Sequence, residues 1–450
     1  MSIEHSSTVG HPIETVFAWH ERPGAFARLA PPWQPVRLVE EAGSLADGKA
    51  VIGLPGGFRW VAQHGGYDPP RRFVDDLVSL PLHWHHVHSF APEGPSRTRV
   101  TDTVTTPVPA ALLRSTFVYR HTQLRDDLDA IGHLRQLDPT PRTVAVTGSS
   151  GLVGAALCAF LSTAGHRVVR LVRRVPRMDG ERAWNPDDPD PGIFEGVDAV
   201  VHLAGASIAG RFSEQHKTSI ASSRVEPTRR LADAVARSGG PRILIVASAI
   251  GYYGSDRGNE LLDEASGRGG GFLADVVARW EAATERAIDA GLRVVTVRTG
   301  VVLSGRGGML KLLRPVFLAG LGGRIGTGSQ WLSWIDLDDL TDVYARALFD
   351  EHLAGVLNAV APTPVQNGEF SATLARVLHR PALVPVPTSA LGVFVGAEGV
   401  REVACASQRV APRRLEAAGF AFRRPQLEGS LRHQLGHGLG HGLEGIARSG

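Results

Sequence analysis

The sequence predicts an α/β chain in which a doubly wound parallel sheet begins at residue 143 and a smaller α+β domain precedes it. From residue 143 onward, runs rich in Val, Ile and Ala alternate with amphipathic stretches of helix length, as in βαβ units. A glycine-rich segment follows the first such run. Two prolines within residues 138–142 interrupt the upstream pattern and predict a linker.

The composition narrows the classes of function. The length of 450 residues allows about three domains, or one small and one large domain. Apolar runs reach only strand length and the first ten residues lack the basic start of a signal peptide, which predicts a cytoplasmic protein with no membrane association. A net charge of +3 is too small to imply nucleic-acid binding. The two cysteines, Cys158 and Cys405, provide neither a disulfide framework nor a four-ligand zinc site and are expected in the core.

Residues 1–137 are predicted to form short strands followed by one amphipathic helix at 112–134, which a curved sheet could cover. The strand-like segments are 51–52, 59–63, 84–90 and 97–104. At the third segment and just before it, His83 and His85 share one strand face, and His86 and His88 share the other. Because no cysteine or carboxylate flanks them in that stretch, we expect no metal site and an exposed strand whose imidazoles meet solvent or a pocket mouth.

The second region is predicted to contain five strands of a parallel sheet, at 144–147, 168–172, 199–203, 243–247 and 294–298. Residues 143–305 form the predicted nucleotide-binding domain, and residues 306–432 the substrate-binding portion over its crevice. Residues 433–450 contain histidines spaced four apart, but their glycine density predicts a disordered tail rather than a metal-binding helix.

The strongest local signal is the glycine-rich segment 147–154, placed between a predicted strand and a predicted helix at 152–164. Gly148 permits a tight turn, Gly151 lets backbone NH groups approach a pyrophosphate, and Gly154 allows close packing of helix on strand. The helix N-terminus then faces the phosphates. This is the pattern of a dinucleotide-binding Rossmann domain, and the alternative is a glycine-rich turn without a ligand. The other loop residues expected at the cofactor are Ser149, Ser150, Leu152 and Val153.

The residues after the second strand indicate which dinucleotide binds. NAD sites place an acidic residue there, but no acidic residue occurs between Leu152 and Met178. Arg170, Arg173 and Arg174 lie there instead, and guanidinium groups suit the 2′-phosphate of NADP. We select Arg173 because it falls at the end of the strand, with arginines on a solvated strand end as the alternative.

Several further segments complete a pattern that resembles the extended short-chain dehydrogenase/reductase superfamily, and within it the epimerase-like group related to nucleoside-diphosphate-sugar epimerases. The resemblance covers about residues 143–432 and rests on segments 198–205, 223–226, 248–254, 280–283, 298–302, 326–335 and 357–362. It implies NADP(H) along the glycine loop, with Arg173 at the 2′-phosphate and Leu203 and Ala204 along the nucleotide. It also implies Arg224 nearby and Val302 close to the nicotinamide.

The chain departs from that superfamily in its catalytic residues. Active members use a Tyr-x-x-x-Lys pair, whereas here Tyr252 is followed four residues later by Asp256. Ser248 stands at the superfamily's serine position, and Tyr252 or Tyr253 is a candidate for a displaced acid, although both tyrosines could simply pack a turn. Two interpretations stay open. One is an NADP-dependent oxidoreductase or epimerase acting on a lipophilic or sugar-like small molecule, and the other is a non-catalytic NADP(H)-binding regulatory or redox-sensing protein.

The first region resembles the polyketide cyclase/START-like helix-grip fold, in which a curved antiparallel sheet grips a long C-terminal helix. The resemblance rests on residues 3–18, with a first helix at 12–17, and on residues 117–121 of the closing helix. It implies an apolar cavity that holds a hydrophobic ligand for the reductase domain.

Overall fold

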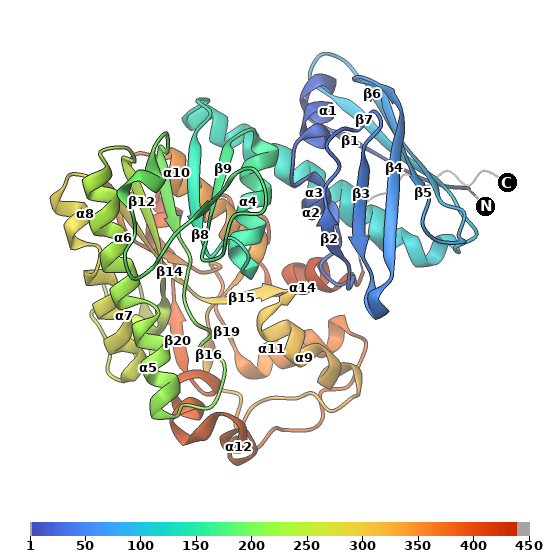
Figure 1. Cartoon of the computed structure of the whole chain (residues 1–450). Helices are drawn as coiled ribbons and strands as arrows, with labels where there is room; N and C mark the ends of the chain where they lie inside the picture. Colours follow the sequence, from blue (N-terminus) through green and yellow to red (C-terminus); the bar gives the residue numbers. More distant parts are fainter. Residues whose placement is uncertain (1, 439–450) are drawn as a thin grey trace. The chain divides into compact units, whose positions relative to one another are not determined.

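The computed structural model describes residues 2–438 and divides them into two compact units (Figure 1). Unit 1 contains residues 2–136, 159–165 and 432–438, and unit 2 contains residues 137–158 and 166–431. No helix within these described residues is both long and apolar enough to cross a bilayer.

Unit 1 is built on a seven-stranded antiparallel sheet of order β1-β7-β6-β5-β4-β3-β2. Its strands are β1 (Ser2–Val9), β2 (Arg37–Glu40), β3 (Lys49–Gly53), β4 (Arg59–Asp68), β5 (Arg72–Leu77), β6 (His85–Pro92) and β7 (Thr98–Thr105). Its helices are α1 (Ile13–Glu21), α2 (Ala25–Leu29) and the long α3 (Ala110–Leu137), and one helical turn lies at Pro55–Gly57. Phe117, Leu124, Leu128 and Ile131 form the buried side of α3. The predicted separate α+β domain is thereby confirmed, while β1, β2 and β5 were not foreseen.

The histidine-rich strand differs from its prediction. β6 pairs with β5 on one side and β7 on the other, so it is an interior strand of the sheet. His86 and His88 are 5% and 2% exposed. The predicted exposed strand is therefore wrong for this face, because α3 and the neighbouring strands cover it. His83 precedes the strand and is exposed, as expected for a surface imidazole.

Unit 2 contains a seven-stranded sheet of order β10-β9-β8-β11-β12-β14-β18, in which every pair is parallel. Its strands are β8 (Thr143–Thr147), β9 (Arg167–Val172), β10 (Glu181–Ala183), β11 (Ala199–His202), β12 (Ile243–Ala249), β14 (Arg293–Thr299) and β18 (Gly355–Ala359). Chain order along the sheet is thus 3-2-1-4-5-6-7, the doubly wound Rossmann arrangement that the sequence predicted. The strand order reverses between β8 and β11, where such sheets bind ligands.

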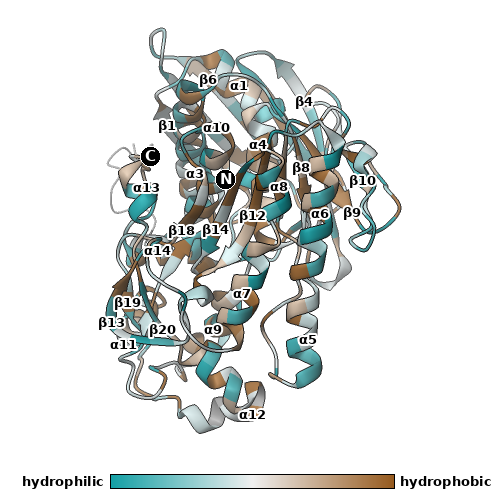
Figure 2. Ribbon diagram, turned by 90° about the vertical axis from the view of Figure 1, so that its left-hand side faces the viewer, coloured by the Kyte–Doolittle hydropathy of each residue, from teal (hydrophilic) through white to brown (hydrophobic). Residues whose placement is uncertain are grey.

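Helices cover the sheet of unit 2 and bury its apolar strands. They are α4 (Leu152–Ala164), α5 (Glu214–Ser222), α6 (Val225–Ser238), α7 (Phe272–Ala282), α8 (Glu285–Asp289) and α10 (Leu337–Phe349), with a helical turn at Pro191–Phe194. Figure 2 shows hydrophobic colour on β8 and β12 and hydrophilic colour on the outer side of α6. Val200, Leu244 and Leu231 belong to one buried cluster that joins strands and helix.

The C-terminal part adds small sheets and helices and also contributes to the main sheet. Its elements are β13 (Asp256–Leu262), β15 (Val301–Ser304), α9 (Gly308–Leu318), β16 (Trp331–Leu332), β17 (Trp334–Asp336), β19 (Val365–Gln366), α11 (Asn367–Val377), α12 (Thr388–Gly399), a π-helical turn (Val400–Ala404), β20 (Ser407–Val410), α13 (Arg413–Ala417) and α14 (Leu427–Leu435). Because β18 is the last strand of the parallel sheet, that sheet extends beyond the predicted boundary at residue 305. α14 also includes residues 433–435, so the predicted disordered tail begins too early, and residues 439–450 lie outside the described residues.

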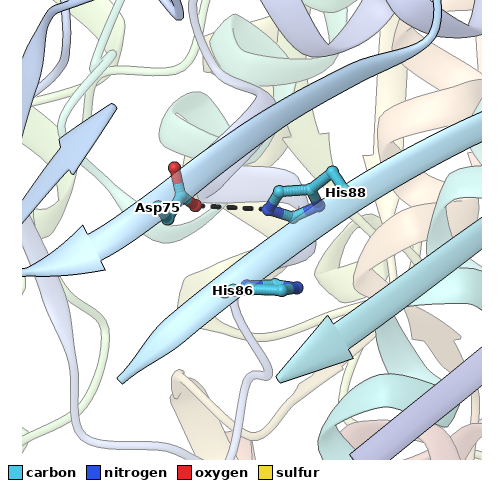
Figure 3. A group of neighbouring side chains, drawn as sticks. All are labelled: Asp75, His86 and His88. Atoms are coloured by element: carbon cyan, nitrogen blue, oxygen red, sulfur yellow. Dashed lines mark hydrogen bonds and ion pairs between the residues drawn. The ribbon is translucent and has the colours of Figure 1, made fainter. Parts of the chain in front are cut away.

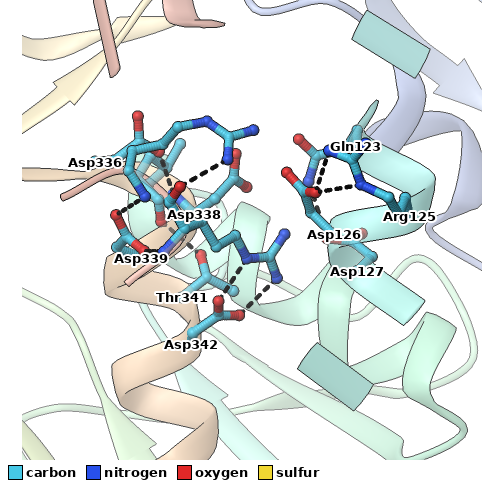
Figure 4. A network of polar contacts seen from close by, with 12 residues as sticks. Gln123, Arg125, Asp126, Asp127, Asp336, Asp338, Asp339, Thr341 and Asp342 are labelled. Carbon is cyan, nitrogen blue, oxygen red and sulfur yellow. Dashed lines mark hydrogen bonds and ion pairs between the residues drawn. The ribbon is translucent and has the colours of Figure 1, made fainter. Parts of the chain in front are cut away.

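Buried carboxylates at the start of α10 fix the last segment of unit 2 (Figure 4). Asp336 caps α10 through the backbone NH of Asp338 at 2.9 Å. Asp339 accepts hydrogen bonds from the backbone of residues 423 and 424, and Asp342 forms an ion pair with Arg423. The chain preceding α14 is therefore held against a helix of the Rossmann layer.

Candidate cofactor and active site

The glycine loop between β8 and α4 has no room for side chains at two of its positions. Gly148 has φ of +65°, and a Cβ atom there would lie 2.8 Å from the carbonyl carbon of Leu203. A Cβ on Gly154 would collide with the carbonyl oxygen of Gly148. The loop backbone thus runs directly against residues 203 and 204, which follow β11, at the point where the strand order reverses.

The first turn of α4 follows this loop without a break. The NH of Gly151 donates to the carbonyl of Gly148 at 2.9 Å, and Ser149 is buried while Ser150 is exposed. Leu152 and Val153 begin the helix, whose first backbone NH groups have no partner within the helix. Such a terminus carries partial positive charge and suits a phosphate.

The three arginines after the second strand have different surroundings. Arg174 forms a two-pronged ion pair with Glu181, at 2.6 and 2.8 Å. Arg173 directly follows β9, is exposed, and makes no ion pair with any residue in the described range 2–438. Arg170 lies within β9 beside Cys158, a buried side chain of α4. Arg173 is therefore an exposed arginine whose charge is available to an anion.

Arg224 holds the loop that follows β11. Its guanidinium donates to the carbonyl of Ala206 at 2.8 Å and to that of Ile220 at 3.1 Å. It also lies 5.3 Å from the ring centre of Trp280, and burial lowers the pKa of Arg224. The structure thus places Arg224 against Gly205 and Ala206, directly after Leu203 and Ala204 in the chain, where it shapes the loop through backbone contacts.

Val302 lies on β15, which pairs with β17. The turn after β15 returns to the glycine loop, since a Cβ on Gly307 would lie 3.3 Å from a methyl group of Leu152. The structure therefore brings the strand of Val302 close to the start of α4.

A row of polar side chains crosses three neighbouring strands near their carboxyl ends. Ser248 on β12 stands opposite Arg298 on β14, which stands opposite Asn358 on β18. The Ser248 hydroxyl donates to Glu281 of α7 at 2.6 Å. Arg298 donates two hydrogen bonds to the same carboxylate, at 2.8 and 2.7 Å. Burial opposes the charge of Arg298, but its bonds to Glu281 outweigh this and raise its pKa, so the guanidinium stays charged.

The two adjacent tyrosines occupy different environments, on a helical turn at Ile250–Tyr253. Tyr253 is fully buried, and its hydroxyl lies 2.8 Å from both Asn358 and the carbonyl of Asp263 and 3.1 Å from Arg298. Burial raises the pKa of Tyr253. Tyr252 is half-buried, and the guanidinium of Arg298 stacks 3.4 Å from its ring centre. Tyr253 therefore has a structural role, since hydrogen bonds hold its hydroxyl inside the protein. Tyr252 contacts Arg298 through its ring, and no hydrogen bond joins it to Ser248, Glu281 or Arg298.

Comparison with known proteins places this geometry in a family. A profile of the NAD dependent epimerase/dehydratase family matches residues 144–358, and a domain of unknown function, DUF1731, matches residues 386–434. The epimerase family protein Mb2239 of Mycobacterium bovis is 45% identical over 282 residues, which cover 62% of this chain and 93% of that protein. The chain belongs to the NAD-dependent epimerase/dehydratase family.

Solved structures of this epimerase family extend the likeness to both units. The nucleoside-diphosphate sugar epimerase from Corynebacterium glutamicum is 44% identical, with a TM-score of 0.86 over 96% of this chain and 90% of that one. The human epimerase family protein SDR39U1, solved with NADPH, is 32% identical with a TM-score of 0.60, over 65% of this chain and 99% of that one. The first comparison includes the antiparallel domain, and the second covers about two thirds of the chain.

In this epimerase-family chain, sequence reasoning gave no role to Glu281, Arg298 or Asn358. Glu281 and Asn358 lie in segments that carry only the family resemblance, and Arg298 also ends the predicted strand 294–298. The sequence holds a signal for two of them. Arg298 lies near the end of an apolar strand and therefore needs a buried carboxylate, and Glu281 of the preceding helix α7 supplies it.

Proposed function

We propose that unit 2 binds NADP(H) along the glycine loop, with Arg173 at the 2′-phosphate and the pyrophosphate at the start of α4. The main support is that neither Gly148 nor Gly154 has room for a Cβ atom. The loop therefore presents backbone without side chains at the point where the strand order of the sheet reverses. The NADPH in the structure of human SDR39U1 supports the choice of NADP over NAD.

We also propose that this chain acts as an oxidoreductase or epimerase on a small carbonyl or carbinol compound, lipophilic or sugar-like. NADP(H), when bound, supplies or accepts a hydride. Ser248 lies at the carboxyl edge of the sheet, and its hydroxyl donates a hydrogen bond to Glu281. The lone pairs of the Ser248 oxygen therefore stay available to accept a hydrogen bond from a substrate hydroxyl. Because Arg298 neutralises Glu281, that carboxylate orients Ser248 rather than acting as a strong base.

A second candidate function, a non-catalytic NADP(H)-binding regulatory or redox-sensing protein, has its own support. Ser248, Glu281, Arg298 and Tyr253 satisfy one another's hydrogen bonds, and the raised pKa of Tyr253 makes its phenol a poor proton donor to a substrate. No Tyr-x-x-x-Lys pair replaces it. Tyr252 is then the remaining candidate for an acid.

For unit 1 we propose a START-like role in presenting a hydrophobic small molecule. The seven-stranded antiparallel sheet and the 28-residue α3 support it by architecture alone. Native mass spectrometry of the purified chain, and mass spectrometry of its organic extract, would detect a retained lipid, and a unit that never retains one would contradict the proposal. The cytoplasmic location also stays a prediction, which cell fractionation tests.

The cofactor proposal is tested by titrating the purified chain with NADPH and NADH and following nicotinamide fluorescence. We expect Arg173→Ala to weaken NADPH binding by about ten- to a hundredfold, as for one or two charge-assisted hydrogen bonds, and to leave NADH binding unchanged. Arg174→Ala is the matched control, because its charge is already paired with Glu181. Equal effects of the two variants would contradict the role of Arg173.

The two candidate functions separate on turnover. A panel of aldehydes, ketones and nucleotide sugars is mixed with the NADPH-loaded chain, and absorbance reports oxidation of the cofactor. Oxidation that falls at least about tenfold in Ser248→Ala supports the enzyme. Chromatography of the same mixtures detects an epimerised product, because an epimerase returns its hydride and leaves no net oxidation. Unchanged NADPH binding with neither oxidation nor an epimerised product supports the sensor.

A further inference from the structure

Buried histidines and carboxylates meet on one face of the sheet of unit 1. In the strand register Asp75 of β5 stands opposite His86 of β6, and His88 of β6 stands opposite Asp102 of β7. Residues opposite each other in a sheet point to the same side, and His86 and His88, two apart, share that side. Three neighbouring strands thus direct two imidazoles and two carboxylates into the same buried space.

The distances within this group suit a metal ion. The ligand atoms of Asp75, His86 and His88 all lie within 4.8 Å of one another (Figure 3). The His88 Nε2 atom lies 3.2 Å from a carboxylate oxygen of Asp75. Tetrahedral ligands with bonds of about 2.0 Å are separated by about 3.3 Å, so small rotations of side chains bring all three to one ion.

Several polar atoms of this group lack hydrogen bonds although they are buried. They are His86 Nε2, the Asp102 oxygen that also lies 2.7 Å from His88 Nδ1, and the Asp75 oxygen that forms an ion pair with His64. His86 Nε2 approaches Asp102 at 3.1 Å, but without the geometry of a hydrogen bond. His86 is 5% exposed, so a ring nitrogen that meets Asp102 without a hydrogen bond is costly there and requires an explanation.

We propose that Asp75, His86 and His88 bind one divalent transition-metal ion of the zinc type. Imidazole and carboxylate are ligands that zinc accepts, and three protein ligands leave a fourth position open. Asp102 orients His88 from outside the ligand set, because one of its oxygens lies 2.7 Å from His88 Nδ1. This carboxylate–histidine–metal arrangement is common in zinc proteins.

Asp102 is itself held in place on the side away from His88. Arg120 and His121 contact the other oxygen of Asp102.

The strands offer a matched control for each ligand. His85 and Asp76 are the sequence neighbours of His86 and Asp75, they face the opposite side of the sheet, and they pair with each other at 2.7 Å. The full chain, free of any affinity tag, is stripped with a chelator, loaded with Zn²⁺, desalted and analysed for bound metal. We expect one zinc ion per chain in the wild type, His85→Gln and Asp76→Asn, and none in His86→Gln and Asp75→Asn.

Two further measurements keep the test decisive. Co²⁺ in place of Zn²⁺ should give d–d absorption bands that are lost in Asp75→Asn, a change of nearly equal shape at a carboxyl that is 23% exposed. Asp102→Asn should retain the stoichiometry but weaken zinc binding by about ten- to a hundredfold. Circular dichroism establishes that each variant is folded.

Three outcomes would overturn the assignment. The first is a folded wild type that retains no zinc after desalting. The second is equal retention by the wild type, His86→Gln and Asp75→Asn. The third is zinc that is lost instead in a His437→Ala/His441→Ala variant, which would place the ion on the C-terminal histidines.

Discussion

In each unit a row of buried polar side chains crosses neighbouring strands in register, but the two rows differ in how far they satisfy themselves. In unit 2, Ser248, Arg298 and Asn358 form a row completed by Glu281 and Tyr253, and each member has a hydrogen-bond partner. In unit 1, the row of Asp75, the two histidines of β6 and Asp102 leaves buried atoms without one. Because the row in unit 2 satisfies its own hydrogen bonds, we interpret it as the wall of a site that lies beside it. The unsatisfied atoms of the row in unit 1 support the proposal that a metal ion binds among them.

Breaking the complete row should have the largest effect. Glu281→Gln removes the carboxylate from Arg298, which is 4% exposed, and we expect the free energy of unfolding of unit 2 to fall by about 3 kcal/mol. Urea unfolding measures this. Glu285→Gln, an exposed site just beyond α7, should change it by less than about 0.5 kcal/mol. Similar values for the two variants would contradict a buried ion pair.

Acid should weaken both units through histidines outside the two rows. Burial lowers the pKa of His20 in unit 1 to about 3 and that of His202 in unit 2 to about 4, from 6.5 when unfolded. At a pH between the folded and the unfolded pKa, each histidine is protonated in the unfolded chain and neutral in the folded one. The free energy of unfolding therefore falls as the pH drops below 6.5. Each histidine contributes a slope of about 1.4 kcal/mol per pH unit. Unfolding curves from neutral pH downward should show this slope reduced in His20→Gln and His202→Asn, and an unchanged slope would count against neutral buried imidazoles.

The smallest effects should distinguish the adjacent tyrosines. Tyr253→Phe removes a hydroxyl that contacts Asn358 and Arg298, and should cost about 1–3 kcal/mol of stability. Tyr252→Phe keeps the ring stacked on Arg298 and should cost less than about 0.5 kcal/mol. Thermal melts compare the two. If Tyr252→Phe were the more damaging change, the assignment of Tyr253 to packing would be wrong.

The sequence predicted the fold of unit 2 well, because its features are local. The apolar strands, their spacing and the loop from Gly148 to Gly154 are contiguous in the chain and have one physical interpretation. It missed β10 and β18, since the first has only three residues and the second comes after a long stretch of other elements.

Cross-strand and cross-layer partners were the part that sequence reasoning could not supply. His86 was interpreted without a carboxylate because none lies nearby in sequence, whereas Asp75 and Asp102 reach it from two other strands. Glu281 and Arg298 likewise meet only after helix and sheet have packed. Register and packing, rather than local spacing, created both groups.

Calorimetric titration of the wild type and Gly148→Ala with NADPH tests whether unit 2 holds NADP(H) on the glycine loop. The wild type should bind one NADPH per chain, and the variant should bind none, because its Cβ strikes the backbone of residues 203 and 204 at a φ of +65°. A wild type without binding, or a folded Gly148→Ala that binds as tightly as the wild type, would contradict the account.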